Sequence, residues 1–389
     1  MELTRQVPPS TGRYWNSKGS GTLKDRHYDV VQLGLGVMGL ATVEASSRRG
    51  FKTLGIEQFD SPLHAYGSSY GPTRMIRQAY YEDPRYVPLV LSAYRAWSDL
   101  EKWASQTLLL PGGGLVVGAS SSPVVRGARQ SAMAHGLPFD VVGVEELFPR
   151  YGLGAGHDTV ALFEPGAGVL KAADALHVLH QKAQHQGAEF QFDTRISCIS
   201  GQVGSFRIAT TRGEWIGAEH LIITPGPWIT EWLELPVRIE RQPVFWIETD
   251  DPPEIPAFLY DRGHVLLYGF PYVPGRGLKM GVHHTREYTT PTEVDRVVSP
   301  AEIADMLGHM NQIFPGHRWR LRDAEVCLYS TTPDGHFILG QADGGMVVGA
   351  GFSGHGFKFA PVIGEMLLDS ALSGTNPQDY DLFWPTRFA

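Results

Sequence analysis

The feature that most constrains this chain is a glycine pattern near its N-terminal end. Residues 28–57, YDVVQLGLGVMGLATVEASSRRGFKTLGIE, predict a strand, a turn with three glycines, a helix and a second strand ending at Glu57. Gly34 allows a tight turn, Gly36 lets the backbone approach a pyrophosphate, and Gly39 allows close helix–strand packing. Glu57, about 20 residues on, is placed to accept a hydrogen bond from a ribose hydroxyl. The segment predicts a dinucleotide site for FAD or NAD, and Glu57 argues against NADP.

Length and composition limit the protein class. At 389 residues the chain suits two domains, and its 42% apolar and 19% charged residues are typical of a soluble globular protein. A net charge of −8 supplies no basic surface for nucleic acid. No run approaches the roughly 20 apolar residues of a membrane span. We therefore expect neither a nucleic-acid nor a membrane partner.

The two cysteines, Cys198 and Cys327, could form at most one disulfide and match no zinc-ligand spacing. We therefore expect a reducing compartment, the cytoplasm, and no metal site. Cys327, in EVCLYSTTPDGHF, is either a small buried hydrophobe or a sulfur that does chemistry. Residues 1–27 are polar, without the apolar core of a secretory signal, and are interpreted as an N-terminal extension.

The predicted secondary structure alternates along the chain between two kinds of segment. Residues 28–105, 163–236 and 320–389 have α/β character, whereas residues 106–162 and 237–319 are richer in strands. This alternation predicts an α/β nucleotide-binding domain assembled from separated segments, with a β-rich α+β substrate domain between them. Helices are expected at 86–103, at about 171–186, and after Ser299, where Ser299, Pro300 and Glu302 form a capping box.

Two arginines and two lysines stand in unusual settings. Arg74 and Arg77, in GSSYGPTRMIR, would share one side of a helical turn, either as a solvated basic face or as a carboxylate-binding pair. Lys279, in GRGLKMGVHH, either extends from a strand edge to solvent or stabilises developing negative charge near a redox ring. Lys358 lies in GFSGHGFKF, a glycine-rich turn between a strand and a helix whose N-terminus is expected near residues 355–358.

Three histidines lie along the helix expected at 171–186. The spacing of His177, His180 and His185 matches no metal site, and a solvated helix face is the expected arrangement.

Five ordered segments together resemble a known family. They are GLGVMG with Glu57, GSSYGPTRMIR, YGFPYVPGRGLKMGVHH, VCLYSTTPDGHF and GFSGHGFKF. In this order and spacing the chain, from about residue 28 to its C-terminus, resembles the monomeric sarcosine oxidase and N-methyltryptophan oxidase family. That family lies within the glycine/D-amino-acid oxidase superfamily of FAD-dependent amine oxidoreductases.

The resemblance implies a role for each matching residue. Cys327 matches the cysteine that carries FAD covalently, and Lys279 the lysine that activates oxygen. Arg77 and Lys358 match the pair that holds the substrate carboxylate. Tyr268, His283, Tyr329 and His355 match cavity residues, with His283 a candidate for proton management. The implied cofactor-binding residues are Gly34, Gly36, Val37, Met38, Gly39, Glu57, Gln58, Arg74, Ile196, Trp228, Cys327, Gly354, His355, Gly356 and Lys358.

The implied chemistry is oxidation of a secondary amine, such as an N-methyl or cyclic amino acid, to an imine that hydrolyses, while oxygen is reduced to hydrogen peroxide. The expected partners are the amine and oxygen, and the expected state is a monomer. A dehydrogenase that passes electrons to another protein, or a flavin-carrying binding protein with little turnover, are the alternatives. Pro72 and Pro227 depart from the family pattern. Of Phe245 and Trp246, a strand would place only one toward the cavity.

Overall fold

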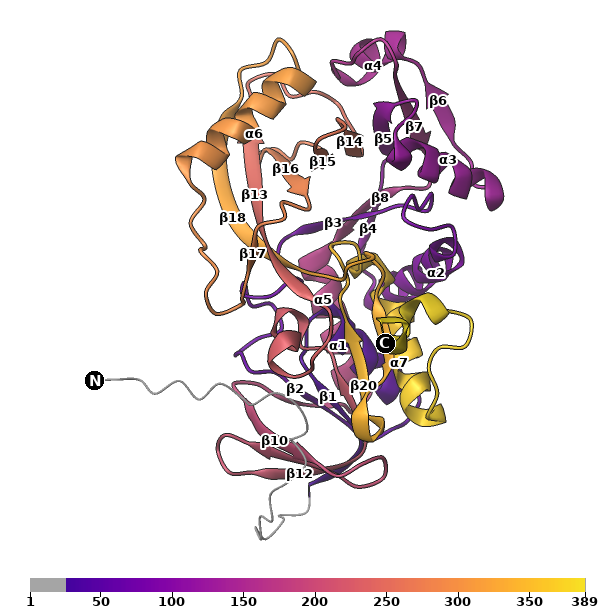
Figure 1. Ribbon diagram of the computed structural model, residues 1–389, viewed down its shortest axis with the longest axis vertical. Helices are drawn as coiled ribbons and strands as arrows, with labels where there is room; N and C mark the ends of the chain where they lie inside the picture. The colour runs from indigo at the N-terminus through magenta and orange to yellow at the C-terminus, as the bar shows by residue number, and fades with distance from the viewer. Residues whose placement is uncertain (1–25, 389) are drawn as a thin grey trace, which may run out of the picture. The chain divides into compact units, whose positions relative to one another are not determined.

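The computed structural model describes residues 26–388, which divide into two compact units (Figure 1). The first unit contains residues 26–69, Leu176–Arg238 and 330–388, and the second contains Tyr70–Ala175 and Ile239–Tyr329. The division differs from the predicted segments because residues 70–105, 163–175 and 320–329 lie in the second unit. There, β3 (Thr73–Ile76) pairs with β8 (Gly168–Lys171), and β18 (Arg320–Thr331) pairs with β13 (Arg238–Glu248). Residues 1–25, most of the predicted extension, lie outside the described residues.

The first unit is built on a sheet of eight described strands with a parallel centre. The strand order is β10-β11-β12-β1-β2-β9, and β20 joins β12 in parallel. β10 and β11 extend β12 as antiparallel strands, and β19 pairs antiparallel with β20. The strands are β1 (His27–Leu33), β2 (Thr53–Ile56), β9 (Glu189–Gln191), β10 (Ile196–Ser200), β11 (Phe206–Thr210), β12 (Trp215–Ile223), β19 (Ile338–Gln341) and β20 (Val347–Ala350).

Helices α1 (Val37–Arg48) and α7 (Ala360–Ser373) lie against each other in the first unit (Figure 1). A Cβ on Gly364 of α7 would lie 2.5 Å from the carbonyl carbon of Ala41, so only glycine allows this close approach. α5 (Ala172–His185) is the third long helix here, and the short 3-10 helices are η1 (Gly226–Glu231), η2 (Asp343–Gly345), η3 (Phe357–Phe359), η4 (Asp381–Phe383) and η5 (Pro385–Phe388). Residues such as Val31 and Leu221 are fully buried, as expected for a parallel strand covered on both faces.

The second unit contains a large sheet of nine strands and a small one of three. The large sheet has the order β17-β13-β16-β15-β14-β5-β7-β6, with β18 also paired to β13, and the small sheet has the order β3-β8-β4. The strands not yet given are β4 (Leu109–Pro111), β5 (Gly114–Ala119), β6 (Asp140–Val142), β7 (Thr159–Glu164), β14 (Ala257–Asp261), β15 (Leu266–Gly269), β16 (Leu278–His283) and β17 (Tyr288–Thr289).

Four helices belong to the second unit: α2 (Tyr86–Ala104), α3 (Pro123–Ala134), α4 (Val144–Tyr151) and α6 (Pro300–Ile313). α6 lies beside β13 and β16 (Figure 1). It packs Met306, Met310 and Ile313 into the unit's main core. The capping box predicted at Ser299 is present, because the Ser299 hydroxyl accepts from Glu302 N and the Glu302 carboxylate accepts from Ser299 N.

The helices predicted at 86–103 and 171–186 are confirmed within one residue at each end. The C-terminal helix begins later than expected, at Ala360, because η3 occupies Phe357–Phe359 first. Among residues 26–388, no helix is both long and apolar enough to cross a membrane.

Candidate active site

The glycine turn of the first unit adopts the conformation that its sequence predicts. Gly34 has φ of 85°, in the left-handed region that favours glycine. A Cβ on Gly34 would lie 2.6 Å from Thr224 O, and one on Gly39 would lie 1.9 Å from Gly34 O. The turn therefore packs too closely for any side chain at these two positions.

Helix α1 begins directly after this turn. Its N-cap is Gly36, which supplies no side-chain cap, and Val37 N donates to Ser69 Oγ at 3.0 Å. The first residues Val37 and Met38 are buried. A helix N-terminus that opens from a glycine turn presents backbone N–H groups and the positive end of the helix dipole, which suits a pyrophosphate.

Glu57 follows β2 and lies beside the same turn. Its carboxylate accepts from Leu35 N and Gln58 N, both at 2.8 Å, and its side chain is almost fully buried. Burial raises the pKa of Glu57, and the backbone N–H groups oppose that effect. Because Gly34 and Gly39 leave no room for side chains in the turn and a buried carboxylate lies beside it, the residues fit the pyrophosphate and ribose of a dinucleotide such as FAD.

An aromatic cluster lies close to Glu57. The ring of Trp228, in η1, is 5.3 Å from that of Phe59 and 6.2 Å from that of His64, and His64 Nε2 is 4.0 Å from a Glu57 oxygen. Trp228 was predicted from the sequence, whereas Phe59 and His64 were not. Ile196, the other predicted residue of this part, is the first residue of β10.

The C-terminal turn holds the side chains of Lys358 and His355 by backbone contacts. Lys358 Nζ donates to His355 O at 2.8 Å, and His355 Nε2 lies 3.0 Å from Gly335 O. Ser353 and Gly354 have φ of 46° and 77°. Lys358 and His355 are 5% and 6% exposed, and Gly356 lies between them. The predicted residues of this turn therefore form one compact local structure.

Lys279, on β16, is a buried lysine of the second unit. It is 4% exposed, and its Nζ donates to Thr73 O at 3.2 Å. Nζ also lies 5.0 Å from the centre of the Phe270 ring and 5.8 Å from that of Trp246. Burial, followed by the charge of Arg74, lowers the pKa of Lys279 to about 7. The lysine therefore does not reach solvent from a strand edge.

Arg74 lies on β3, where its guanidinium donates to the carbonyl oxygens of Thr73 and Tyr70. The expectation of a helical turn through Arg74 and Arg77 is wrong, because β3 is extended and pairs with β8. Side chains three apart along a strand point to opposite faces. The two arginines accordingly have different surroundings.

Arg77 already has a carboxylate partner. Its Nη2 lies 2.6 Å from both Glu82 oxygens, and its guanidinium lies over the rings of Tyr80 and Tyr81. Burial alone would lower the pKa of Arg77, but the charges of Glu82, Tyr80 and Tyr81 and the hydrogen bond to Glu82 together outweigh it, so the pKa is raised. Glu164 further fixes this segment by accepting from Gln78 N and Ala79 N.

Tyr268, Tyr329 and His283 gather near Lys279 in the second unit. The ring of His283 is 5.7 Å from that of Tyr329, and the hydroxyl groups of Tyr268 and Tyr329 are hydrogen-bonded. Burial raises the pKa of both tyrosines, and the charges of Cys327 and Arg74 act on both. Cys327, on β18, is half-buried and also acts on Lys279. These residues therefore form one group with Arg74 and Lys279.

Phe245 and Trp246 are adjacent on β13, so their side chains point to opposite faces of the sheet. Phe245 belongs to the main core of the unit, whereas Trp246 lies opposite Lys279 in the β13–β16 pair. Sequence reasoning missed Thr73, Phe270 and Glu325 near Lys279. It also left open that Trp246, and not Phe245, has its ring near the lysine. Glu325 could have been found because it lies two residues before Cys327, on the same face of β18.

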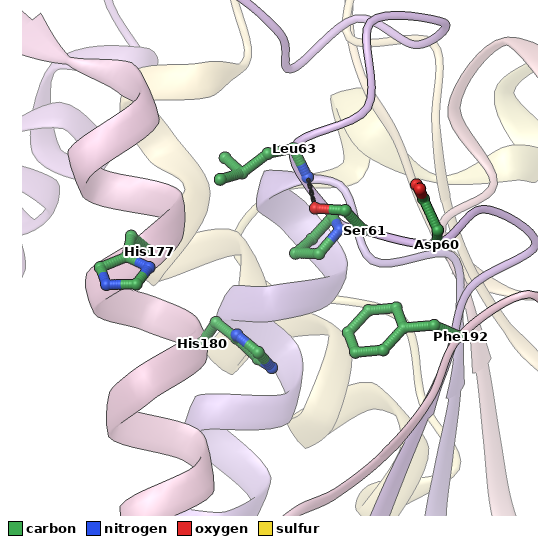
Figure 2. A pocket seen from close by; sticks show the side chains of 7 residues that line it. Asp60, Ser61, Leu63, His177, His180 and Phe192 are labelled. Carbon is green, nitrogen blue, oxygen red and sulfur yellow. Dashed lines mark hydrogen bonds between the residues drawn. The ribbon is translucent and has the colours of Figure 1, made fainter.

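A small pocket of the first unit lies outside these groups. Figure 2 shows Asp60, Ser61 and Leu63 facing His177, His180 and Phe192 across it. Its volume is about 210 Å³, below the roughly 300–1,000 Å³ of ordinary ligand sites. His177 and His185 are exposed, as predicted, but His180 packs edge-on against Phe190 and Phe192, and burial lowers its pKa. No cluster of possible metal ligands occurs within residues 26–388.

The fold and the glycine turn define a dinucleotide-binding protein, and comparison with known proteins identifies the family. The family model "FAD dependent oxidoreductase" matches residues 29–370. The chain belongs to this family, whose cofactor is FAD, so the choice between FAD and NAD is settled.

Named relatives and a solved structure agree with this assignment. Monomeric sarcosine oxidase of Streptomyces avermitilis is 35% identical, covering 93% of this chain and 98% of that protein. N-methyl-L-tryptophan oxidase of Yersinia pestis is 29% identical, covering 93% and 99%. The solved structure of NikD, an amino acid oxidase essential for nikkomycin biosynthesis, superposes with a TM-score of 0.81 at 22% identity, covering 92% and 98%. The predicted fold class and family are confirmed.

Proposed function

We propose that this protein is an FAD-dependent oxidase of secondary amines, taking N-methyl or cyclic amino acids such as sarcosine, N-methyltryptophan or pipecolate. The product would be an imine that hydrolyses, and oxygen would be reduced to hydrogen peroxide. The relatives named above support the substrate class. The observation that carries the oxidase activity is Lys279, a buried lysine between aromatic rings with Arg74 and Cys327 close by.

When bound, FAD would supply the two-electron acceptor for the carbon next to nitrogen and the electrons for oxygen. Lys279 would provide a positive charge fixed in a dry environment, where it stabilises negative charge developing on oxygen more strongly than in water. Trp246 and Phe270 would exclude water from that charge. His283 and Tyr329 would manage protons released by the amine.

Cys327 is proposed to carry FAD through a thioether. Cys327 is half-buried and its thiol interacts electrostatically with Lys279 and Tyr268. The thiolate is the reactive form of cysteine for forming such a bond. Covalent attachment would fix the flavin next to the lysine.

Lys358 and Arg77 are proposed to bind the substrate carboxylate. Lys358 is a buried cation in a glycine turn, suited to a point-charge contact. Arg77 must share its guanidinium with Glu82 or release that pair, because both Glu82 oxygens lie 2.6 Å from Nη2. The predicted cofactor residues from Gly34 to Lys358 keep their proposed roles.

We also propose that the enzyme is a monomer in the cytoplasm. The name of the Streptomyces relative supports the first part. Among the described residues Cys198 and Cys327 form no disulfide, which is compatible with a reducing compartment. Light scattering of the purified holoenzyme would test the first statement, and fractionation of the source cells the second.

The test is an anaerobic titration followed by admission of oxygen. Sarcosine, N-methyltryptophan, pipecolate, proline and a glycated amino acid are mixed in turn with the oxidised holoenzyme. We expect at least one to bleach the visible absorbance of the flavin, and oxygen to restore it with one peroxide released per flavin. Bleaching without peroxide would indicate the dehydrogenase, and no bleaching by any of them would indicate a flavin-carrying binding protein.

A further inference from the structure

Three charged groups of the second unit converge on Gly71. A Cβ on Gly71 would lie 3.2 Å from Arg74 Nη1, 3.8 Å from Glu325 Oε1 and 3.9 Å from Lys279 Nζ. Two cations and one carboxylate therefore end within 4 Å of a single point. Gly71 leaves this space open because it has no side chain and a φ of 103°.

Glu325 reaches this point from the strand that also carries Cys327. Both residues lie on β18, two apart, so their side chains share one face of the strand. Glu325 is half-buried, and its charge acts on both Lys279 and Tyr268. The carboxylate is therefore part of the Lys279 group and not of the solvated surface.

We propose that Glu325 is the counter-charge of the Lys279–Arg74 pair and a positioning residue that keeps Lys279 protonated for the oxygen half of the reaction. This inference rests on the proposed function only for its kinetic consequence. The electrostatic relation among the three side chains stands on geometry alone.

The balance of charges around Lys279 explains why a carboxylate is needed. Arg74 on β3 is a like charge, and the rings of Trp246 and Phe270 remove water. Burial and Arg74 lower the pKa of Lys279, whereas the thiol of Cys327 and the carboxylate of Glu325 raise it; Tyr268, on β15, faces the same group. An opposite charge within reach favours the protonated amine. Without Glu325, the pKa of Lys279 would be lower still.

Competitive acetylation measures this relation directly in the holoenzyme. Acetic anhydride reacts with the neutral amine, so the labelling of Lys279, quantified by mass spectrometry across pH, gives its titration midpoint. Glu325→Gln keeps the shape of the side chain and removes its charge. We expect the midpoint to fall by about one pH unit. Glu325→Asp should restore most of the shift.

Asp323→Asn is the matched control, because Asp323 is exposed on the same face of β18, two residues earlier. In Asp323→Asn the labelling midpoint of Lys279 should stay at the wild-type value. A midpoint unchanged in Glu325→Gln, or lowered equally in Asp323→Asn, would overturn the proposal.

The kinetic consequence is measured without any amine substrate. The holoenzyme is reduced with dithionite and mixed with oxygen in a stopped-flow instrument at pH 7.5. A one-unit fall in the Lys279 midpoint predicts about five- to tenfold slower reoxidation in Glu325→Gln. A shifted midpoint with unchanged reoxidation would overturn the positioning role. Failure of every amine to bleach the flavin would overturn the proposed function while leaving the labelling result intact.

Discussion

The two buried lysines within residues 26–388 are equally hidden but differently held. Lys279 and Lys358 are 4% and 5% exposed. Lys358 donates to a carbonyl three residues earlier in its own turn, at 2.8 Å. Lys279 instead meets Thr73 O, two aromatic rings and the charge of Arg74, all from other elements of its unit.

The surroundings of Lys358 fix the position of its amine, whereas those of Lys279 control whether its amine is charged. A local turn fixes where the Lys358 amine lies, which suits a contact that must be made at one place. The surroundings of Lys279 act on whether its amine is charged, because burial and Arg74 bring its pKa to about 7. We therefore expect changes near Lys279 to affect electron transfer to oxygen, and changes near Lys358 to affect substrate binding.

The largest expected effect concerns Cys327, which is one of the groups that act on Lys279. Cys327→Ser removes the sulfur needed for a thioether, so covalent attachment should be lost completely. Acid precipitation should then leave the yellow colour in the supernatant, whereas the wild-type pellet stays yellow. Cys198→Ser is the control and should keep the colour in the pellet. Wild-type flavin that dissolves in acid would show that Cys327 has no such bond.

Lys358→Met should weaken binding of carboxylate substrates about ten- to a hundredfold, because a hydrogen bond to a charged group contributes about 1.5–3 kcal/mol. Arg77→Lys should act in the same direction, since lysine keeps the charge beside Glu82 but not the planar fork. Anaerobic titration of flavin reduction gives the substrate affinity. Unchanged affinity in both variants would refute the carboxylate assignment. Slower reoxidation of the flavin in Lys358→Met would contradict the division of roles, in which only Lys279 acts on the reaction with oxygen.

The buried charge of Lys279 should also appear in stability. Its folded pKa is lowered from 10.5 to about 7, so the unfolded chain takes up the proton first as pH falls. The wild type therefore loses stability between about pH 10 and 7 relative to Lys279→Met, and the difference is constant below pH 7. Melting temperatures of the two proteins should diverge by a few degrees across this range. Parallel melting curves would show that the lysine is not desolvated.

Much of the fold could be predicted because its signals are local. The glycine turn requires residues without side chains, as the close contacts at Gly34 and Gly39 show. The helix at 86–103 and the capping box at Ser299 depend on neighbours within a few residues. The start of α7 was misplaced because η3, a tighter helix, precedes it.

Single residues of the site could be predicted from the sequence, but their contacts with one another could not. Glu325, Phe270 and Thr73 meet Lys279 through long-range packing, which no local pattern specifies. Arg74 and Arg77 looked like neighbours on a helix, but pairing of β3 with β8 made the segment a strand. The helix pattern predicts a solvated His180, but Phe190 of β9 and Phe192 just after that strand pack against it.

The most direct test of the oxidase assignment separates the two halves of the reaction in Lys279→Met. The enzyme is reduced anaerobically with the best amine of the panel and then mixed with oxygen in a second stopped-flow step. Loss of one preorganised charge predicts about 100- to 1,000-fold slower reoxidation, with the rate of flavin reduction changed only a few-fold. Normal reoxidation together with impaired reduction would contradict the assignment of Lys279 to oxygen.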